Sequence, residues 1–217
     1  MLSKVTPYII VIVVASLLGF ITENIWVGLR FGFVDNRGMM APGLIGYGMA
    51  MVGMYILLGT PEMPRFLGQR IYFASNELQI AYYIFMAGVL VSVGEILLGT
   101  AVERFCQIEW WNYSSLPLHI GKYTSVFTSI GFGMMITIFM NHIFPYLFSR
   151  ALTVNDVLIE SLVYVLFVLL VVDFIHEAKY MIKNKHINKI WKVDIKEKYI
   201  VNHDQVRYIH GCWRQAV

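Results

Sequence analysis

Long apolar stretches separated by short polar ones run through most of the chain. A helix that crosses the hydrocarbon core of a bilayer needs about 20 mostly apolar residues. Stretches close to this length predict membrane-spanning helices near residues 7–29, 42–60, 79–102, 125–147 and 157–176. We predict helices rather than strands because backbone groups in hydrocarbon must be bonded within their own segment. The pattern also lacks the short alternating stretches typical of a barrel.

The first stretch has a second interpretation as a cleavable signal peptide, because Lys4 precedes it. Its apolar pattern runs past the usual length of about 7 to 15 residues for a signal core, and no Ala-x-Ala site follows. We therefore favour a membrane span. The predicted fold is all-α: an integral membrane five-helix bundle, followed by a polar tail from residue 178.

Composition agrees with the bilayer as solvent. Of the 217 residues, 58% are hydrophobic and only 14% are charged, and the mean hydropathy is +0.62. Soluble proteins carry about 25% charged residues. Such a chain lacks the polar surface of an ordinary soluble enzyme, and its composition also excludes a disulfide-stapled secreted domain and a disordered chain.

Positive charge is concentrated at the C-terminal end. Residues 178–217 hold nine Lys or Arg and three acidic residues, a net charge of +6, whereas residues 1–177 carry −3. Because Lys and Arg gather on the cytoplasmic side, we expect a cell-membrane protein with its N-terminus outside and its C-terminus in the cytoplasm. The tail is expected to leave the membrane as a helix that lies on anionic headgroups. A positive-inside anchor explains this charge, so we expect no nucleic-acid partner.

Two parts of the chain echo each other. Gly19 precedes Glu23 by four residues, as Gly99 precedes Glu103. A Gly-aromatic-Gly-Met run follows each pair, at 46–49 and again at 131–134. This predicts two similar helical hairpins that share one orientation, related by an axis along the membrane normal. The fifth span follows them.

Few acidic side chains lie within the predicted spans, and these are the first functional candidates. A carboxylate at membrane depth is costly unless it is paired, hydrated or protonated. Glu95, Gly99 and Glu103 form one stripe on a helix. The candidate polar path or binding site therefore consists of Glu23, Arg37, Glu95 and Glu103. The alternative is that Glu23 and Glu103 pair with nearby cations at the membrane interface.

Metal and cofactor sites are not expected. Cys106 and Cys212 lack the paired spacing of a structural zinc site. Two groups could supply ligands, but they also fit solvated residues at the membrane edge: Asp173, His176 and Glu177, and His203, His210 and Cys212. The sequence contains no His-Glu-x-x-His, phosphate-loop or Gly-x-Ser-x-Gly motif, and an enzyme is therefore not favoured.

The connections between the spans carry further motifs. Asn36-Arg37-Gly38 connects the first hairpin, and Trp110-Trp111-Asn112-Tyr113-Ser114 followed by Lys122 connects the second. As composition alone, the tryptophans also fit an aromatic belt at the membrane interface. With Glu23 and Glu103, these motifs resemble bacterial membrane proteins of the CmpB type, labelled ABC-transporter permeases, over about residues 15–135. In that family Asp usually stands at the position of Asn112, and Arg near that of Lys122.

The resemblance implies a permease-like transporter component that works with a separate ATPase subunit, since this sequence has no nucleotide-binding motif. Two other functions stay open. The chain could be a non-transporting scaffold or regulator that docks a partner through its Trp-rich loop and tail. Less favoured is a membrane-embedded lipid-modifying enzyme with a Glu as base and Arg37 or Lys122 holding phosphate.

Overall fold

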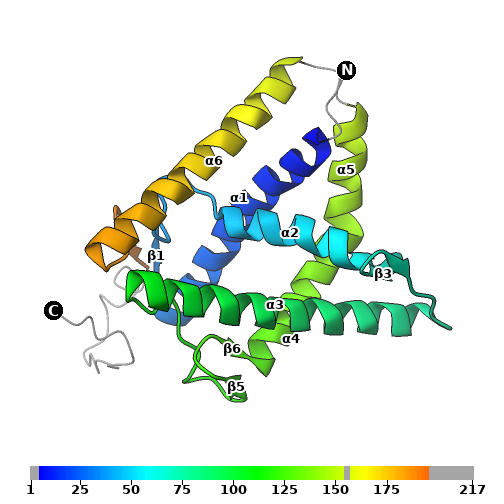
Figure 1. Cartoon of the computed structure of the whole chain (residues 1–217), viewed down its shortest axis with the longest axis horizontal. Helices are drawn as coiled ribbons and strands as arrows, with labels where there is room; N and C mark the ends of the chain where they lie inside the picture. The colour runs from blue at the N-terminus through cyan, green and yellow to red at the C-terminus, as the bar shows by residue number, and fades with distance from the viewer. Residues whose placement is uncertain (1–4, 154–156, 196–217) are drawn as a thin grey trace.

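A computed structural model of the chain describes residues 5–153 and 157–195. Helices dominate it, and three small antiparallel sheets lie in the connections (Figure 1). The helices are α1 (Thr6–Phe31), α2 (Ile45–Leu58), α3 (Asn76–Cys106), α4 (Val126–Ile138), the π-helix η1 (Phe139–Ile143), α5 (Phe144–Thr153) and α6 (Val157–Asn184). The strands are β1 (Phe33–Asp35), β2 (Gly59–Thr60), β3 (Met63–Phe66), β4 (Gln69–Arg70), β5 (His119–Ile120), β6 (Thr124–Ser125) and β7 (Lys192–Asp194).

The all-α membrane fold predicted from the sequence is confirmed. Within the described residues, four helical segments are long and apolar enough to cross a bilayer: Thr6–Phe31, Asn76–Cys106, Val126–Leu152 and Val157–Asn184. The second predicted span forms the 14-residue helix α2. At 1.5 Å per residue this helix is about 21 Å long, which is shorter than the hydrocarbon core of about 30 Å.

The fourth span is one continuous helix with a π-turn in its middle. Residues 139–143 form η1 between α4 and α5. A π-turn inserts one residue, so the faces on its two sides point in different directions. α4 packs on α3, whereas α5 packs on α1. The π-turn thus lets one helix contact both hairpins.

The two hairpins are α1 with α2 and α3 with α4. In each hairpin a glycine lies where the two helix backbones are in close contact. A side chain at Gly48 would overlap the backbone oxygen of Ile12, and one at Gly133 would overlap that of Ile84. Glycine at these positions lets the backbones approach closely, as small residues do in membrane helix pairs. Between the hairpins lies the main apolar core, which includes Val11, Met54, Tyr83, Met140 and Phe144.

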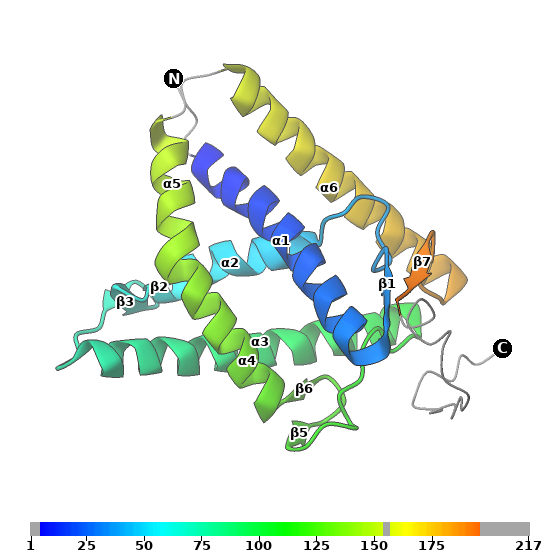
Figure 2. The same cartoon turned by 180° about the vertical axis from the view of Figure 1, so that it is seen from behind.

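The chain after α6 does not continue as the expected surface helix. α6 ends at Asn184, and β7 pairs antiparallel with β1, placing Val193 opposite Val34 (Figure 2). We call residues 186–195 the strap. The prediction that this basic segment is helical is wrong for residues 185–195, since α6 ends at Asn184 and residues 192–194 pair with β1 instead. The rest of the tail lies outside the described residues.

Candidate functional site

A cavity of about 940 Å³ lies between the two hairpins. Its walls come from α1, β1, α2, α3, α4, η1, the 107–125 connection and the strap. The predicted site residues among its lining are Glu23, Arg37, Gly38, Glu95, Trp110, Trp111, Asn112 and Tyr113. The remaining candidates, Asn36, Glu103, Ser114 and Lys122, lie outside the lining. Five further polar residues in the lining were not among the candidates: Thr22, Arg30, Asp35, Tyr47 and Lys189.

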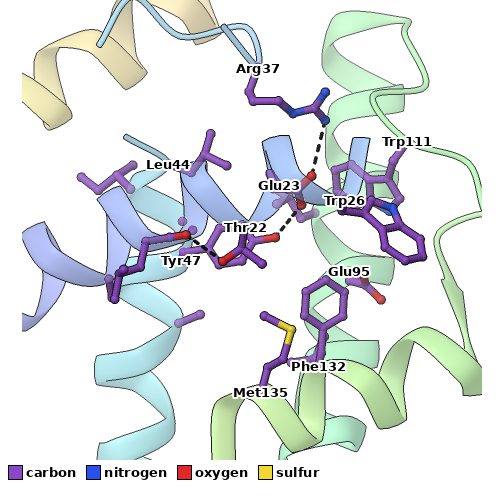
Figure 3. Close-up of a pocket in the computed structure, with 18 of the residues that line it drawn as sticks. Thr22, Glu23, Trp26, Arg37, Leu44, Tyr47, Glu95, Trp111, Phe132 and Met135 are labelled. Carbon is purple, nitrogen blue, oxygen red and sulfur yellow. Dashed lines mark hydrogen bonds and ion pairs between the residues drawn. The ribbon is translucent and has the colours of Figure 1, made fainter. Parts of the chain in front are cut away.

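Glu23 is the centre of a polar cluster at one end of the cavity (Figure 3). The hydroxyl group of Tyr47 donates a hydrogen bond to Glu23 Oε1. Arg37 Nη2 lies 3.5 Å from Glu23 Oε2, and its Nη1 lies 3.4 Å from Asp35 Oδ1. Arg30, two turns further along α1, instead donates to Ser115 Oγ at 3.4 Å. Glu23 is thus both paired and hydrogen-bonded, which makes a carboxylate tolerable at this depth.

The turn at Asp35 holds Arg37 in place. The backbone N–H groups of Asp35 and Arg37 donate to Asn24 Oδ1 and Asp35 Oδ1, both at 2.9 Å. Arg37 has a positive φ of 52° and Gly38 one of 77°. Aspartate side chains commonly bond the backbone two residues on and stabilise such turns. The short Asn36-Arg37-Gly38 motif therefore bends the chain so that the guanidinium group returns to Glu23.

Asn36 has a structural role in this motif. Its side chain is 1% exposed. Nδ2 donates to the backbone oxygens of Met39 and Asn188, each at 2.9 Å, and Oδ1 accepts from the N–H of Ile190 at 3.2 Å. Every polar atom of the amide is used. Asn36 therefore ties the first connection to the strap.

Glu95 has far fewer partners than Glu23. The hydroxyl group of Thr124 is near Glu95, and its hydrogen-bonding partner is the hydroxyl group of Ser129 at 3.2 Å. The carboxylate atom Oε2 is buried and has no hydrogen-bonding partner within the described residues. None of the ion pairs in that part of the chain includes Glu95. Figure 3 shows Glu95 among the labelled aromatic side chains Trp26, Trp111 and Phe132.

Glu103 belongs to a separate, more exposed cluster. Lys122 Nζ lies within ion-pairing distance of Glu103 and is 2.8 Å from Glu109 Oε1. These two carboxylates raise the pKa of Lys122. The pKa of Glu109 is held below its ordinary value, mainly by the hydrogen bond from Lys122 and to a smaller extent by that from Asn112. Glu103 therefore lies outside the cavity lining, whereas Glu23 and Glu95 are part of it.

Each hairpin contains the same contact, in which one tyrosine packs on a glycine and hydrogen-bonds to a glutamate. Tyr47 fills the space beside Gly19 and bonds Glu23, while Tyr123 fills the space beside Gly99 and bonds Glu103. Sequence comparison matched the run around Tyr47 with 131–134, and therefore missed Tyr123. The signal available was an aromatic residue 24 or 20 positions after the glutamate.

The Trp-rich connection is held by side-chain hydrogen bonds and forms part of the cavity wall. Trp111 Nε1 donates to the backbone oxygen of Tyr123 at 2.9 Å. Asn112 donates to Glu109 Oε2 at 2.8 Å and accepts from the N–H of Ser114 at 2.8 Å. The pKa of the Tyr113 hydroxyl is raised, mainly because the group is buried and to a smaller extent because of the negative charges of Glu95 and Glu23. Tyr113 is therefore a neutral group beside both acids.

The acidic residues of α6 have structural partners. Asp173 accepts hydrogen bonds from the backbone N–H groups of Met40 at 3.0 Å and Ala41 at 2.9 Å. Glu177, 0% exposed, accepts from Asn188 Nδ2 at 3.0 Å. No cluster of three or more potential metal ligands occurs in the described part of the chain. The other proposed ligand group, His203, His210 and Cys212, lies outside it.

Comparison with known proteins adds the family. A family model described as "Putative ABC-transporter type IV" matches residues 10–178, and this is the CmpB-type family. The chain belongs to it. This match extends the motif resemblance beyond residue 135 to include α6, whose Asp173 and Glu177 secure the first connection and the strap. No match was found among the curated proteins or among the solved structures.

Proposed function

We propose that this member of the family is the membrane component of a transport system, and that the cavity between the hairpins is its substrate-binding site. The observation that carries the proposal is the cavity itself. About 940 Å³ is the size of sites that enclose a small organic molecule. Its walls are mainly apolar, with the polar residues Glu23, Arg37, Glu95 and Tyr113 among them.

Transport of a substrate against its gradient needs a source of energy such as ATP hydrolysis. The sequence has no phosphate-binding loop with which this chain would bind ATP. We propose a separate ATPase subunit as partner, with the chain embedded in the cell membrane. An outside N-terminus and a cytoplasmic tail, as the positive charge of residues 178–217 favours, would place that tail on the ATPase side.

A test uses two glycines with open space beside them. Gly94 on α3 lines the cavity, and a side chain there meets nothing within 4 Å. Gly131 on α4 also has nothing within 4 Å but is outside the lining. Proteoliposomes that contain the chain and its ATPase are tested for uptake of a broad solute panel. We expect Gly94→Leu to abolish uptake and Gly131→Leu to retain it.

Equal uptake by both variants would contradict a role for this cavity. Absence of uptake for every solute, with correctly folded protein and ATPase present, would contradict transport and favour the scaffold interpretation. Folding of each variant is checked by its unfolding midpoint.

A further inference from the structure

Glu95 is a half-buried acid that lacks a basic partner in the described part of the chain. One of its carboxylate oxygens, Oε2, has no hydrogen-bonding partner within the described chain. A second carboxylate, Glu23, lines the same cavity. An isolated carboxylate out of water is unfavourable, and a second carboxylate nearby makes its ionisation less favourable still. The carboxyl group of Glu95 is therefore ionised most readily when a positive charge lies beside it.

Three basic side chains line the cavity, Arg30, Arg37 and Lys189, and none of them forms an ion pair with Glu95 in the described part of the chain. Arg37 is shared between Glu23 and Asp35. Arg30 lies over two aromatic rings, 5.7 Å from the centre of Trp26 and 5.2 Å from that of Phe31. Arg30 also donates to Ser115. Neither arginine ion-pairs with Glu95, so a positive charge that enters the cavity from outside would be stabilised by this carboxylate.

The walls around Glu95 suit a cation with an apolar body. Trp26, Trp111, Tyr113 and Phe132 all line the cavity, as Glu95 does. Three of these aromatic residues are labelled in Figure 3, and they come from α1, the 107–125 connection and α4. Aromatic faces attract cations, most strongly when water is excluded, and cages of such rings bind quaternary ammonium groups. Arg30 already uses Trp26 in this way.

We infer that the cavity binds a lipophilic organic cation, whose charge is met by Glu95 and whose apolar groups lie against the aromatic walls. This inference rests on the proposed function, because it names the class of substrate for the same cavity. It goes further in assigning Glu95 rather than Glu23 as the residue that selects charge, since Glu23 is already paired with Arg37.

The experiment compares two probes of the same shape and opposite charge, tetraphenylphosphonium and tetraphenylborate. Binding to the purified full-length chain in nanodiscs is measured by quenching of tryptophan fluorescence, with empty nanodiscs correcting for partition into lipid. We expect tetraphenylphosphonium to bind and tetraphenylborate not to compete. Glu95→Gln keeps the shape and removes the charge, and should weaken phosphonium binding by about tenfold or more, equivalent to about 1.4 kcal/mol.

Glu103→Gln is the matched control, because it removes a carboxylate from the same helix outside the cavity lining. It should leave phosphonium binding unchanged. The unfolding midpoint of Glu95→Gln without probe should not fall, since a buried unpaired charge has been removed. This separates a loss of binding from a loss of folding.

Each outcome distinguishes the inference from the proposed function. If Glu95→Gln binds the phosphonium as tightly as the native chain, or if neither probe binds, the cation assignment is overturned. If both probes bind equally and Gly94→Leu removes both, the cavity is a binding site without charge selection, so the proposed function stands and the inference fails. Unchanged phosphonium binding by Gly94→Leu would overturn both.

Discussion

At the scale of single residues, a glycine, a glutamate and a tyrosine form the same contact in both hairpins. In each, the ring lies where a side chain on the glycine would be, and the hydroxyl group reaches the glutamate one turn further on. The surroundings then decide what each glutamate does. Glu23 lines the cavity and pairs with Arg37, whereas Glu103 pairs with Lys122 away from it.

Replacement of Gly19 tests how closely this contact is packed. A Cβ atom at Gly19 would overlap the ring of Tyr47, whereas one at Gly53 on α2 meets nothing within 4 Å. We expect Gly19→Ala to reduce the free energy of unfolding by about 1 to 3 kcal/mol, the usual cost of overpacking. Gly53→Ala should instead increase it by up to about 1 kcal/mol, because alanine favours helix more than glycine does. Chemical denaturation in detergent micelles measures both.

The two substitutions are expected to change the free energy of unfolding in opposite directions, so the comparison tests the packing at Gly19 directly. A Gly19→Ala variant as stable as Gly53→Ala would show that the tyrosine ring can move away, and that the contact is not a fixed part of the fold.

At the scale of elements, the strap holds the first connection through a small number of defined bonds. β7 pairs with β1, the N–H of Ile195 donates to the backbone oxygen of Gly32 at 2.7 Å, and Asn36 bonds residues 188 and 190. Ile187 lies close to Gly38, where a Cβ atom would be 2.8 Å from its Cγ2 atom. The strap contributes Ile187 and Lys189 to the cavity wall. The cavity and the strap are therefore one structural unit.

Asn36→Ala should loosen the strap. The substitution removes the side-chain bonds to Asn188 and Ile190, and an unmet buried hydrogen bond costs about 1 to 3 kcal/mol. Hydrogen exchange followed by mass spectrometry should show faster exchange of the backbone amides in residues 186–195. Asn184→Ala is the control, because it removes only an exposed bond to the backbone oxygen of Tyr180. Equal exchange in the two variants would contradict the role of Asn36.

At the scale of the whole molecule, the number of crossings depends on α2. Four helical segments in the described chain meet the length of a bilayer crossing and α2 does not. With five crossings the connections at residues 32–44 and 107–125 share one side, and residues 59–75 lie on the other. If α2 stays on one side, residues 32–44 and 59–75 share a side instead.

Three exposed positions distinguish these arrangements: Met40, Leu67 and Ser115. Each is changed to Cys in a chain whose Cys106 and Cys212 are Ser, and intact cells are treated with a membrane-impermeant maleimide. Five crossings with an outside N-terminus predict labelling at position 67 alone. Labelling at 115 alone would mean that α2 does not cross, and labelling at 40 and 67 together would mean the same with the N-terminus inside.

Features that depend on residues close together in the sequence could be predicted from it. The apolar stretches identified the helices, and the scarcity of charge in them pointed to Glu23 and Glu95, both of which line the cavity. The sequence could not predict the strap, because its bonds join residues about 150 positions apart, and lysines spaced along 179–192 also fit a surface helix. Asp173 was expected to be a solvated residue at the membrane edge, but its oxygens accept from backbone groups 132 and 133 positions away.

The strap has a consequence for biosynthesis. Ile187 and Lys189 close the cavity from one side, and they are made after every helix of the bundle. While the ribosome is still adding α6, the space between the hairpins has no wall at this place, and the buried amide of Asn36 has no partner at residues 188 and 190. Completion of the cavity is therefore a late event in assembly, which follows the insertion of the last span.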